Sequence, residues 1–388
     1  MTASRILRRL PLLCAIASAA ACMVSTTSAW AEIHVGVVLS TTGAASSQGG
    51  PERDMITLLP DKLAGEPVRY TILDDATDPS LAVKNARKLV LSDRVDVLVG
   101  SSNTPSSLVL ADVALESRTP HVSLAPMDVP ANQHPWVFVV PQSADLMIGG
   151  VLEHMQKNNI KTVGYIGYSQ PWGDQVYRSL TSLSGKYGIK VLNDERFART
   201  DTSVMPQVLK TVALKPDAVL VGATGTPAAL PHLTLVERGY KGPIYHTHGV
   251  VNDDFLRVGG PRIDGALAPI GPVVVYKDLP DGDPVKAVSL KFAALYGRLE
   301  RPGPVNAFAT WAYDAYLLLD KAAAGALAKA KPGTPEFRVA LRDALETQTS
   351  GLVGSNGIYR ITASDHNGLD SRARVMVRAQ GGSWRAER

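Results

Sequence analysis

Short, nearly continuous apolar runs alternate with longer amphipathic segments along this chain, and this alternation limits its fold more than any other feature. The short runs are typical of parallel strands covered on both faces, and the longer segments are typical of helices. Their alternation predicts an α/β fold with doubly wound sheets. The expected strands are residues 33–39, 69–73, 95–99, 121–124, 162–166, 218–221 and 244–246. The expected helices are residues 81–91, 106–116, 146–158, 173–187 and 228–238.

One short pattern occurs twice and indicates an internal repeat. The sequence Val-Leu-Val-Gly stands at 97–100 and at 219–222, and each copy is followed at the same spacing by a Thr-Pro pair that begins at Thr104 or Thr226. Each copy reads as a strand that ends at glycine and turns into a helix, with threonine as N-cap and proline at the first helical position. A strand followed by Thr-Pro also arises by chance. The matched spacing favours two similarly folded lobes.

The first 31 residues have the composition of an export signal. Arg5, Arg8 and Arg9 precede an apolar run over 10–24, and a small-x-small cleavage pattern ends at Ala31. Cleavage there leaves 357 residues, which suggests about two domains at ~150 residues each. A lipoprotein alternative, with a lipid on Cys22, has a poor recognition sequence. We therefore expect a secreted, periplasmic protein.

Charge and cysteine content exclude several function classes. Removal of 1–31 lowers the Lys and Arg count from 40 to 37, against 36 Asp and Glu, so no basic surface for nucleic acid is expected. Both cysteines, Cys14 and Cys22, lie in the removed segment, which excludes a cysteine nucleophile and thiolate metal sites after cleavage. No later segment reaches transmembrane length.

Enzyme motifs are also missing from the sequence. It contains no G-x-S-x-G elbow, Walker A loop, G-x-G-x-x-G turn or HExxH helix. Asp74 and Asp75 can pass for paired catalytic carboxylates, but their place at a strand end favours a structural role. His246 and His248 share a face of a strand, yet no third metal ligand is evident. We expect no enzyme activity, no cofactor and no metal.

Several segments of the sequence, taken in their order along the chain, resemble the leucine/isoleucine/valine-type periplasmic binding proteins of ABC transporters. The resemblance covers nearly the whole chain after residue 31. The resemblance is carried by residues 33–43, 73–79 with 82–89 (LDDATDP and AVKNARKL), 95–100, 119–123, 136–138, 215–219, 238–244 and 313–316. It implies two Rossmann-like lobes joined by three crossovers that close by a hinge over a ligand. Lobe 1 would be 32–142 plus 276–355, and lobe 2 would be 143–275 plus 356–388. The implied partners are a small-molecule ligand and a membrane permease, and a monomer is expected.

Two loops of lobe 1 are candidates for binding the ligand, because ligands of open α/β sheets sit beyond the carboxyl ends of strands. The turn with Ser102, Asn103 and Thr104 leads into a helix whose first amides favour an anion. By resemblance, Thr104 matches a hydroxyl that binds the ligand's carboxylate. After the next strand, the backbone of Ala125 is a candidate, whereas Met127 stands where amino-acid receptors have an amine-binding hydroxyl.

Candidates from lobe 2 follow from the same resemblance. Tyr168 and Trp172 match a loop whose aromatic residue closes over the ligand. His248 matches an acidic residue that holds an α-ammonium in amino-acid receptors, and a histidine supplies no such counter-charge. Two further candidates from lobe 1 are Ser47 and Gln48 in the first loop. The last candidate is Thr224, in the second copy of the repeat.

Met127 and His248 thus replace both amine-holding groups, while the carboxylate turn is retained. The predicted ligand is a small carboxylate without an α-amine, with an aromatic acid favoured. Two alternatives stay open: a branched-chain or other amino-acid or amide receptor of the same fold, and a ligand-sensing module of a receptor.

Overall fold

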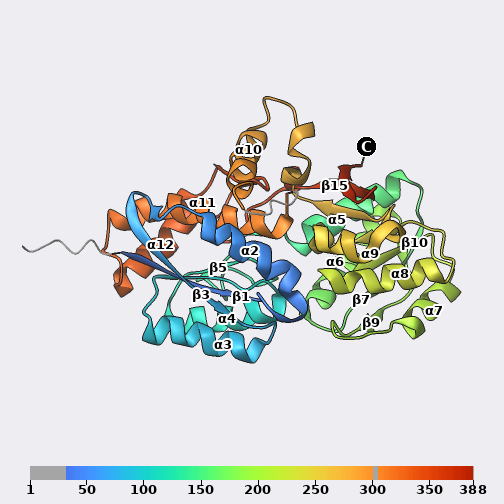
Figure 1. Cartoon of the computed structure of the whole chain (residues 1–388), viewed down its shortest axis with the longest axis horizontal. Helices are drawn as coiled ribbons and strands as arrows, with labels where there is room; N and C mark the ends of the chain where they lie inside the picture. Colours follow the sequence, from blue (N-terminus) through green and yellow to red (C-terminus); the bar gives the residue numbers. More distant parts are fainter. Residues whose placement is uncertain (1–31, 300–304, 388) are drawn as a thin grey trace, which may run out of the picture.

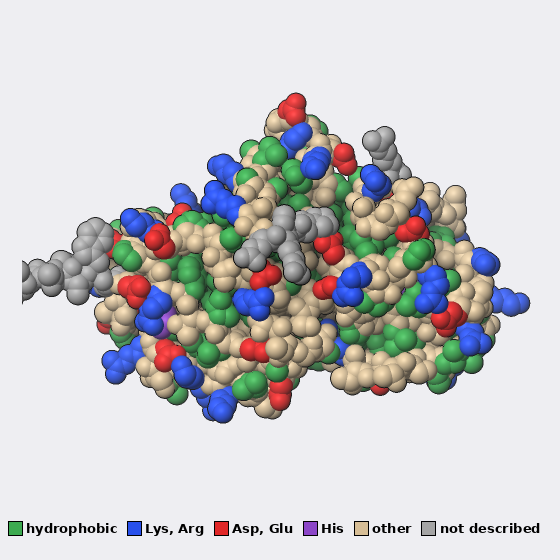
Figure 2. Space-filling model, in the orientation of Figure 1, with side chains coloured by type: hydrophobic (Ala, Val, Ile, Leu, Met, Phe, Trp, Pro, Cys, Tyr) green, Lys and Arg blue, Asp and Glu red, His purple; other side chains and the backbone are tan. Residues whose placement is uncertain are grey.

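The computed structural model describes residues 32–299 and 305–387, so the predicted export signal lies outside the described residues. The chain forms two α/β lobes that lie side by side, each built on its own sheet (Figure 1). No helix within this part of the chain is both long enough and apolar enough to cross a bilayer. Lys and Arg alternate with Asp and Glu over the face drawn in Figure 2.

The first sheet has the strand order β2-β3-β1-β4-β5-β6, and all its pairs are parallel except β2 with β3. Its strands are β1 (Ile33–Leu39), β2 (Lys62–Leu63), β3 (Glu66–Asp74), β4 (Val97–Gly100), β5 (His121–Ser123) and β6 (Val137–Val139). All seven residues of β1 are buried, as expected for a strand with helices on both faces.

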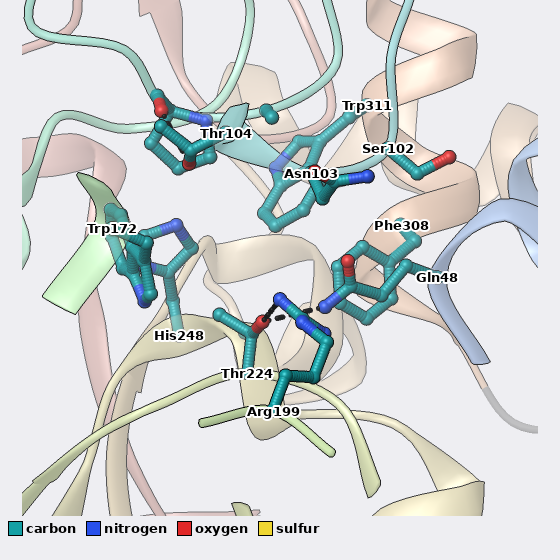
Figure 3. A pocket seen from close by; sticks show the side chains of 13 residues that line it. Gln48, Ser102, Asn103, Thr104, Trp172, Arg199, Thr224, His248, Phe308 and Trp311 are labelled. Carbon is teal, nitrogen blue, oxygen red and sulfur yellow. Dashed lines mark hydrogen bonds between the residues drawn. The ribbon is translucent and has the colours of Figure 1, made fainter. Parts of the chain in front are cut away.

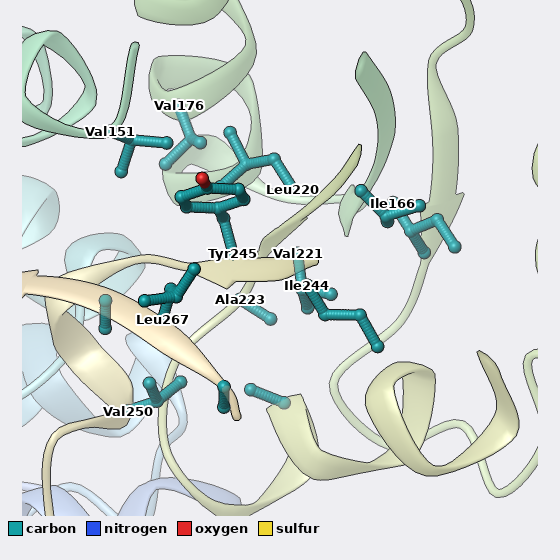
Figure 4. Close-up of a cluster of buried hydrophobic side chains, with 14 of the residues drawn as sticks. Val151, Ile166, Val176, Leu220, Val221, Ala223, Ile244, Tyr245, Val250 and Leu267 are labelled. Carbon is teal, nitrogen blue, oxygen red and sulfur yellow. The ribbon is translucent and has the colours of Figure 1, made fainter. Parts of the chain in front are cut away.

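The second sheet has the order β16-β15-β12-β11-β10-β7-β8, with β9 also paired to β7. Its strands are β7 (Thr162–Tyr168), β8 (Lys190–Val191), β9 (Glu195–Phe197), β10 (Ala218–Gly222), β11 (Ile244–His246), β12 (Leu267–Ile270), β15 (Val375–Gln380) and β16 (Ser383–Ala386). β15 and β16 are antiparallel additions at one edge. Figure 4 shows its core, where Tyr245 lies among Leu220, Val176 and Leu267.

Helices cover the faces of both sheets. Lobe 1 carries α2 (Ser46–Leu58), α3 (Pro79–Arg87), α4 (Thr104–Ser117), α11 (Ala307–Leu327) and α12 (Pro335–Gln348), with the hairpin β13 (Leu352–Val353) and β14 (Ile358–Tyr359). Lobe 2 carries α5 (Ala144–Lys157), α6 (Pro171–Ser184), α7 (Met205–Ala213), α8 (Ala229–Glu237) and α9 (Asp253–Gly259). In the sequence, α10 (Pro284–Tyr296) comes after β12 of lobe 2 and before α11 of lobe 1. All seven predicted strands and five predicted helices are present within a few residues.

The repeat at 97–100 and 219–222 has a clear structural meaning. β4 is the third strand of the series β3-β1-β4-β5-β6, and β10 is the third strand of the matching series β8-β7-β10-β11-β12. The two copies therefore occupy equivalent positions in sheets of the same strand order. The predicted fold class, two doubly wound lobes of similar fold, is confirmed.

Two expectations about chain organisation differ from the structure. The segment treated as the first ligand loop, which contains Ser47 and Gln48, is helix α2, with Pro51 inside it. Tyr359 and Ile361 pack in the core of the first sheet, and the amide of Val139 in β6 donates to the carbonyl of His366, so the chain still packs on lobe 1 at residue 366 rather than leaving it at 355. Tyr359 is fully buried there, and its hydroxyl donates to Asp314 of α11 at 3.1 Å.

The three passages between the lobes meet around Gly271, which follows β12. Gln142, on the passage from β6 to α5, donates from Nε2 to the carbonyl of Ala373 on the last passage, at 2.9 Å. A Cβ placed on Gly271 would lie 2.2 Å from Asn356 Oδ1 and 2.9 Å from Gln142 Nε2. This position therefore has no room for a side chain.

We predict that Gly271→Ala destabilises the protein by about 1–3 kcal/mol, because the added methyl displaces two buried polar side chains. Urea unfolding followed by circular dichroism measures the change. The control is Gly185→Ala, since Gly185 has helical dihedral angles and no atom within 4 Å of its Cβ position. Equal stability of both variants would contradict the crowding at Gly271.

Candidate ligand-binding site

A cavity lies between the carboxyl edges of the two sheets, lined by residues of both lobes (Figure 3). It holds about 300 Å³ of space not occupied by atoms, part of it open to solvent. Lobe 1 contributes Gln48, Ser102, Asn103, Thr104, Ala125, Pro126, Phe308 and Trp311, and lobe 2 contributes Trp172, Arg199, Thr224, His248 and Gly249. The structure thus brings together eight predicted site residues: Gln48, Ser102, Asn103, Thr104, Ala125, Trp172, Thr224 and His248.

The turn between β4 and α4 differs from its prediction in one respect. Asn103, not Thr104, is the N-cap, and its side chain accepts from the amide of Ser106 at 3.1 Å. The amide of Ser107 donates to the carbonyl of Asn103, and the hydroxyl of Thr104 donates to the carbonyl of Pro126 at 3.0 Å. Because these groups already have partners, the helix start offers an anion less than the sequence suggested. Thr226 is likewise no N-cap, since Gly225 precedes the short turn there.

Behind the residues that line the cavity, buried carboxylates connect the loops by hydrogen bonds. Asp75 accepts from the hydroxyls of Ser40 and Ser101, and Glu52 accepts from the hydroxyl of Ser102. Burial raises the pKa of Glu52 well above its usual range. Asp74 accepts from the backbone of neighbouring turns, which fits the structural role expected for the Asp74-Asp75 pair. None of these acids lines the cavity.

Aromatic rings from both lobes form a continuous chain along the cavity. The ring of His248 makes edge-to-face contacts with Trp172, at 5.4 Å between centroids, and with Trp311, at 5.5 Å. Phe308 meets Trp311 in the same way at 5.0 Å. The four side chains are at most 2% exposed. Phe308 and Trp311 lie in the first turns of α11, a segment for which the sequence analysis predicted no helix.

Arg199 was also missed by the sequence analysis. It lies in the loop between β9 and α7, and its guanidinium faces the cavity beside Thr224 (Figure 3). Its Nη2 donates to Thr224 Oγ1 at 3.0 Å, and Gln48 Nε2 donates to the same oxygen at 2.7 Å from the other lobe. Arg199 is the one charged residue among the described lining residues. A lone arginine in an irregular loop carries no signal in the sequence.

Three predicted site residues do not line the cavity. Met127 packs against Ala111 of α4 and against Val137 and Val139 of β6, because this apolar side chain is better buried there than at the cleft. Tyr168 lies behind Arg199, under its guanidinium. Ser47 points toward Gly225 at the junction of the lobes.

Two histidines of lobe 2 lie next to each other. His246 Nε2 is 3.0 Å from His232 Nδ1. No group of three or more His, Cys, Asp or Glu side chains suited to a metal occurs in residues 32–299 and 305–387.

Comparison with known proteins assigns the family. A model of the periplasmic binding protein family matches residues 32–382. The chain belongs to this family. An extracellular ligand-binding receptor of known structure from Rhodopseudomonas palustris HaA2 is 42% identical, with a TM-score of 0.89, over 92% of this chain and 100% of the other. The Leu/Ile/Val-binding protein homolog 1 of Brucella melitensis biotype 1 is 24% identical over 63% of this chain and 68% of its own length.

A more distant solved structure shares the fold of this periplasmic binding protein. It is the solute-binding protein of an ABC transporter from Rhodopseudomonas palustris, solved in complex with benzoate. It is 20% identical over 92% of this chain and 95% of its own, with a TM-score of 0.78.

Buried histidines make the stability of this binding protein dependent on pH. Burial lowers the pKa of His248 to about 3 and the pKa of His121 and of His232 to about 4. These rings are neutral in the fold, whereas an unfolded histidine takes up a proton below about pH 6.5. Their contribution to stability is therefore complete above that pH and falls as the pH drops toward their folded values.

We predict that the free energy of unfolding decreases from pH 6.5 to pH 5, by up to about 2 kcal/mol for each such histidine. Urea unfolding at a series of pH values measures the slope. His248→Gln should reduce that slope by the share of one histidine, because glutamine does not titrate. An unchanged slope would contradict a neutral, buried His248.

Proposed function

We propose that this protein is the solute-binding component of an ABC importer and captures a small carboxylate, with an aromatic acid favoured. The observation that carries the proposal is the charge of the cavity wall. One cation, Arg199, and no acid stand among the described lining residues. A ligand with an ammonium group would lose its hydration there without a counter-charge, which is costly, whereas an acid gains one.

The aromatic wall supports an aromatic ligand body. Trp172, Phe308 and Trp311 offer large apolar surfaces, and offset or edge contacts with a ligand ring add about 0.5–1.5 kcal/mol each beyond burial. His248, neutral at physiological pH, is available to a second oxygen of the ligand. Because the wall comes from both lobes, a bound ligand stabilises the closed form.

An amino-acid receptor is the main alternative, in line with the name of the Brucella homologue. It requires a group that pairs with the α-ammonium, and neither Glu52 nor Asp75 lines the cavity. Both oxygens of Asp75 and Oε2 of Glu52 accept from serine hydroxyls. The family is one of binding proteins, which fits a role in transport rather than catalysis. A periplasmic location, delivery to a membrane permease and a monomeric state belong to the same proposal.

We predict ligand-dependent thermal stabilisation of the protein lacking 1–31 by aromatic carboxylates. A thermal-shift screen over amino acids, aromatic acids, dicarboxylates and amides measures it. Stabilisation of about 2.7 kcal/mol is expected at 100 times Kd, because the ligand binds the native state alone. Stabilisation by leucine or valine, with none by any aromatic acid, would refute the proposed ligand class.

A further inference from the structure

Arg199 has no counter-ion among the described residues. No carboxylate oxygen there lies within 4.0 Å of its guanidinium, whereas Arg196 pairs with Asp194 and Arg178 pairs with Asp128. Its Nη1 is buried and has no hydrogen-bond partner among the described residues. A desolvated cation of this kind is stabilised by an anion that approaches its open edge.

The guanidinium is held in one orientation by two contacts within lobe 2. It lies over the ring of Tyr168, with its central carbon 4.6 Å from the ring centroid. Its Nη2 donates to Thr224 Oγ1, and the phenol of Tyr168 donates to the carbonyl of Thr224 at 2.7 Å. Nη2 is therefore fixed on Thr224, whereas Nη1 has no hydrogen-bond partner among the described residues.

The turn of lobe 1 is a weaker competitor for an anion. The amides of Ser106 and Ser107 and the hydroxyl of Thr104 each have a protein partner already. An anion bound there would have to displace these hydrogen bonds, whereas Arg199 Nη1 has none to lose.

We propose that Arg199 of lobe 2 binds the carboxylate of the ligand and that Tyr168 is its positioning residue. This inference rests on the proposed function, since it assigns the anchor of the same site. It moves the anion anchor from the lobe 1 turn, where the sequence suggested it, to the opposite lobe.

The same arrangement connects the anchor with lobe closure. Thr224 Oγ1 accepts from Arg199 and from Gln48, and Gln48 belongs to α2 of lobe 1. Loss of Gln48 removes a contact between the lobes but no charge. Gln48→Ala should therefore weaken the binding of acids and of neutral ligands alike, whereas loss of Arg199 should weaken the binding of acids alone.

The test is isothermal titration with benzoate, phenylacetate and cinnamate, each beside its neutral primary amide. For every acid that the wild type binds, Arg199→Gln should raise Kd by about 10- to 100-fold, as expected for a charge-assisted hydrogen bond. Kd for the amides should change by less than about threefold. Arg199→Lys should recover part of the loss, because it keeps the charge but not the planar fork.

Tyr168 is tested by a pair of variants. Tyr168→Leu removes the ring under the guanidinium and should raise Kd for the acids by about 3- to 10-fold. Tyr168→Phe keeps the ring and should recover most of that loss. Equal effects of Tyr168→Leu on acids and on amides would show a purely structural role and overturn the positioning assignment.

The controls separate this inference from the proposed function. Arg257→Gln removes an exposed arginine that pairs with Asp254 and should leave every Kd unchanged. Circular dichroism and the melting temperature confirm that each variant is folded. If the wild type binds none of the acids, the proposed function fails. If it binds them and folded Arg199→Gln binds them equally well, only the anchor assignment fails.

Discussion

Burial of the parallel strands on both faces governs where this protein can place polar groups. β1 and β10 are buried along their whole length, so neither sheet offers a polar face. Hydrogen-bonding side chains are confined to strand ends, helix starts and the loops between them. Since both sheets have the same strand order and turn their carboxyl edges toward each other, those groups meet in one cavity.

The polar groups around that cavity are arranged in two layers of different charge. The inner layer holds Arg199 and the rings of Trp172 and Trp311, and the outer layer holds Glu52 and Asp75 in hydrogen bonds to serine hydroxyls. Burial raises the pKa of Glu52, which limits the negative charge directly behind the wall. The acids therefore stabilise the loops, and Arg199 gives the lining of the cavity its positive charge.

Local sequence patterns predicted the fold well because the fold depends on burial, and burial produces a regular spacing of apolar residues in the sequence. The strand at 244–246 and the third strand of each lobe were predicted from short apolar runs alone. α2 was missed because Gly49, Gly50 and Pro51 are poor helix formers, and tertiary packing overrides their propensity. α11 was missed because apolar residues surround most of it, so it shows no amphipathic stripe.

The site was predicted best where a residue follows the carboxyl end of a strand. Ser102, Asn103 and Thr104 were identified by their turn, but Thr104 was wrongly predicted as the cap that Asn103 forms, since both residue types cap helices well. Met127 was predicted to contact the ligand but packs in the core, because an apolar side chain suits either position. Arg199 reaches the cavity through the packing of its loop over Tyr168, which no local pattern encodes.

The three passages between the lobes have a consequence for the order in which the lobes are completed. Lobe 2 builds its central strands from one continuous segment, 162–270, and adds only an edge hairpin from the end of the chain. Lobe 1 instead packs β1 against α11 and α12 and ties Ala64 to Asp320, so its core stays open until residues beyond 345 have arrived. Contacts of such long range form slowly. The half of the molecule that begins the chain therefore cannot complete its core until most of lobe 2 has been made, and lobe 2 completes its own core only with Val377 and Ala379 of β15.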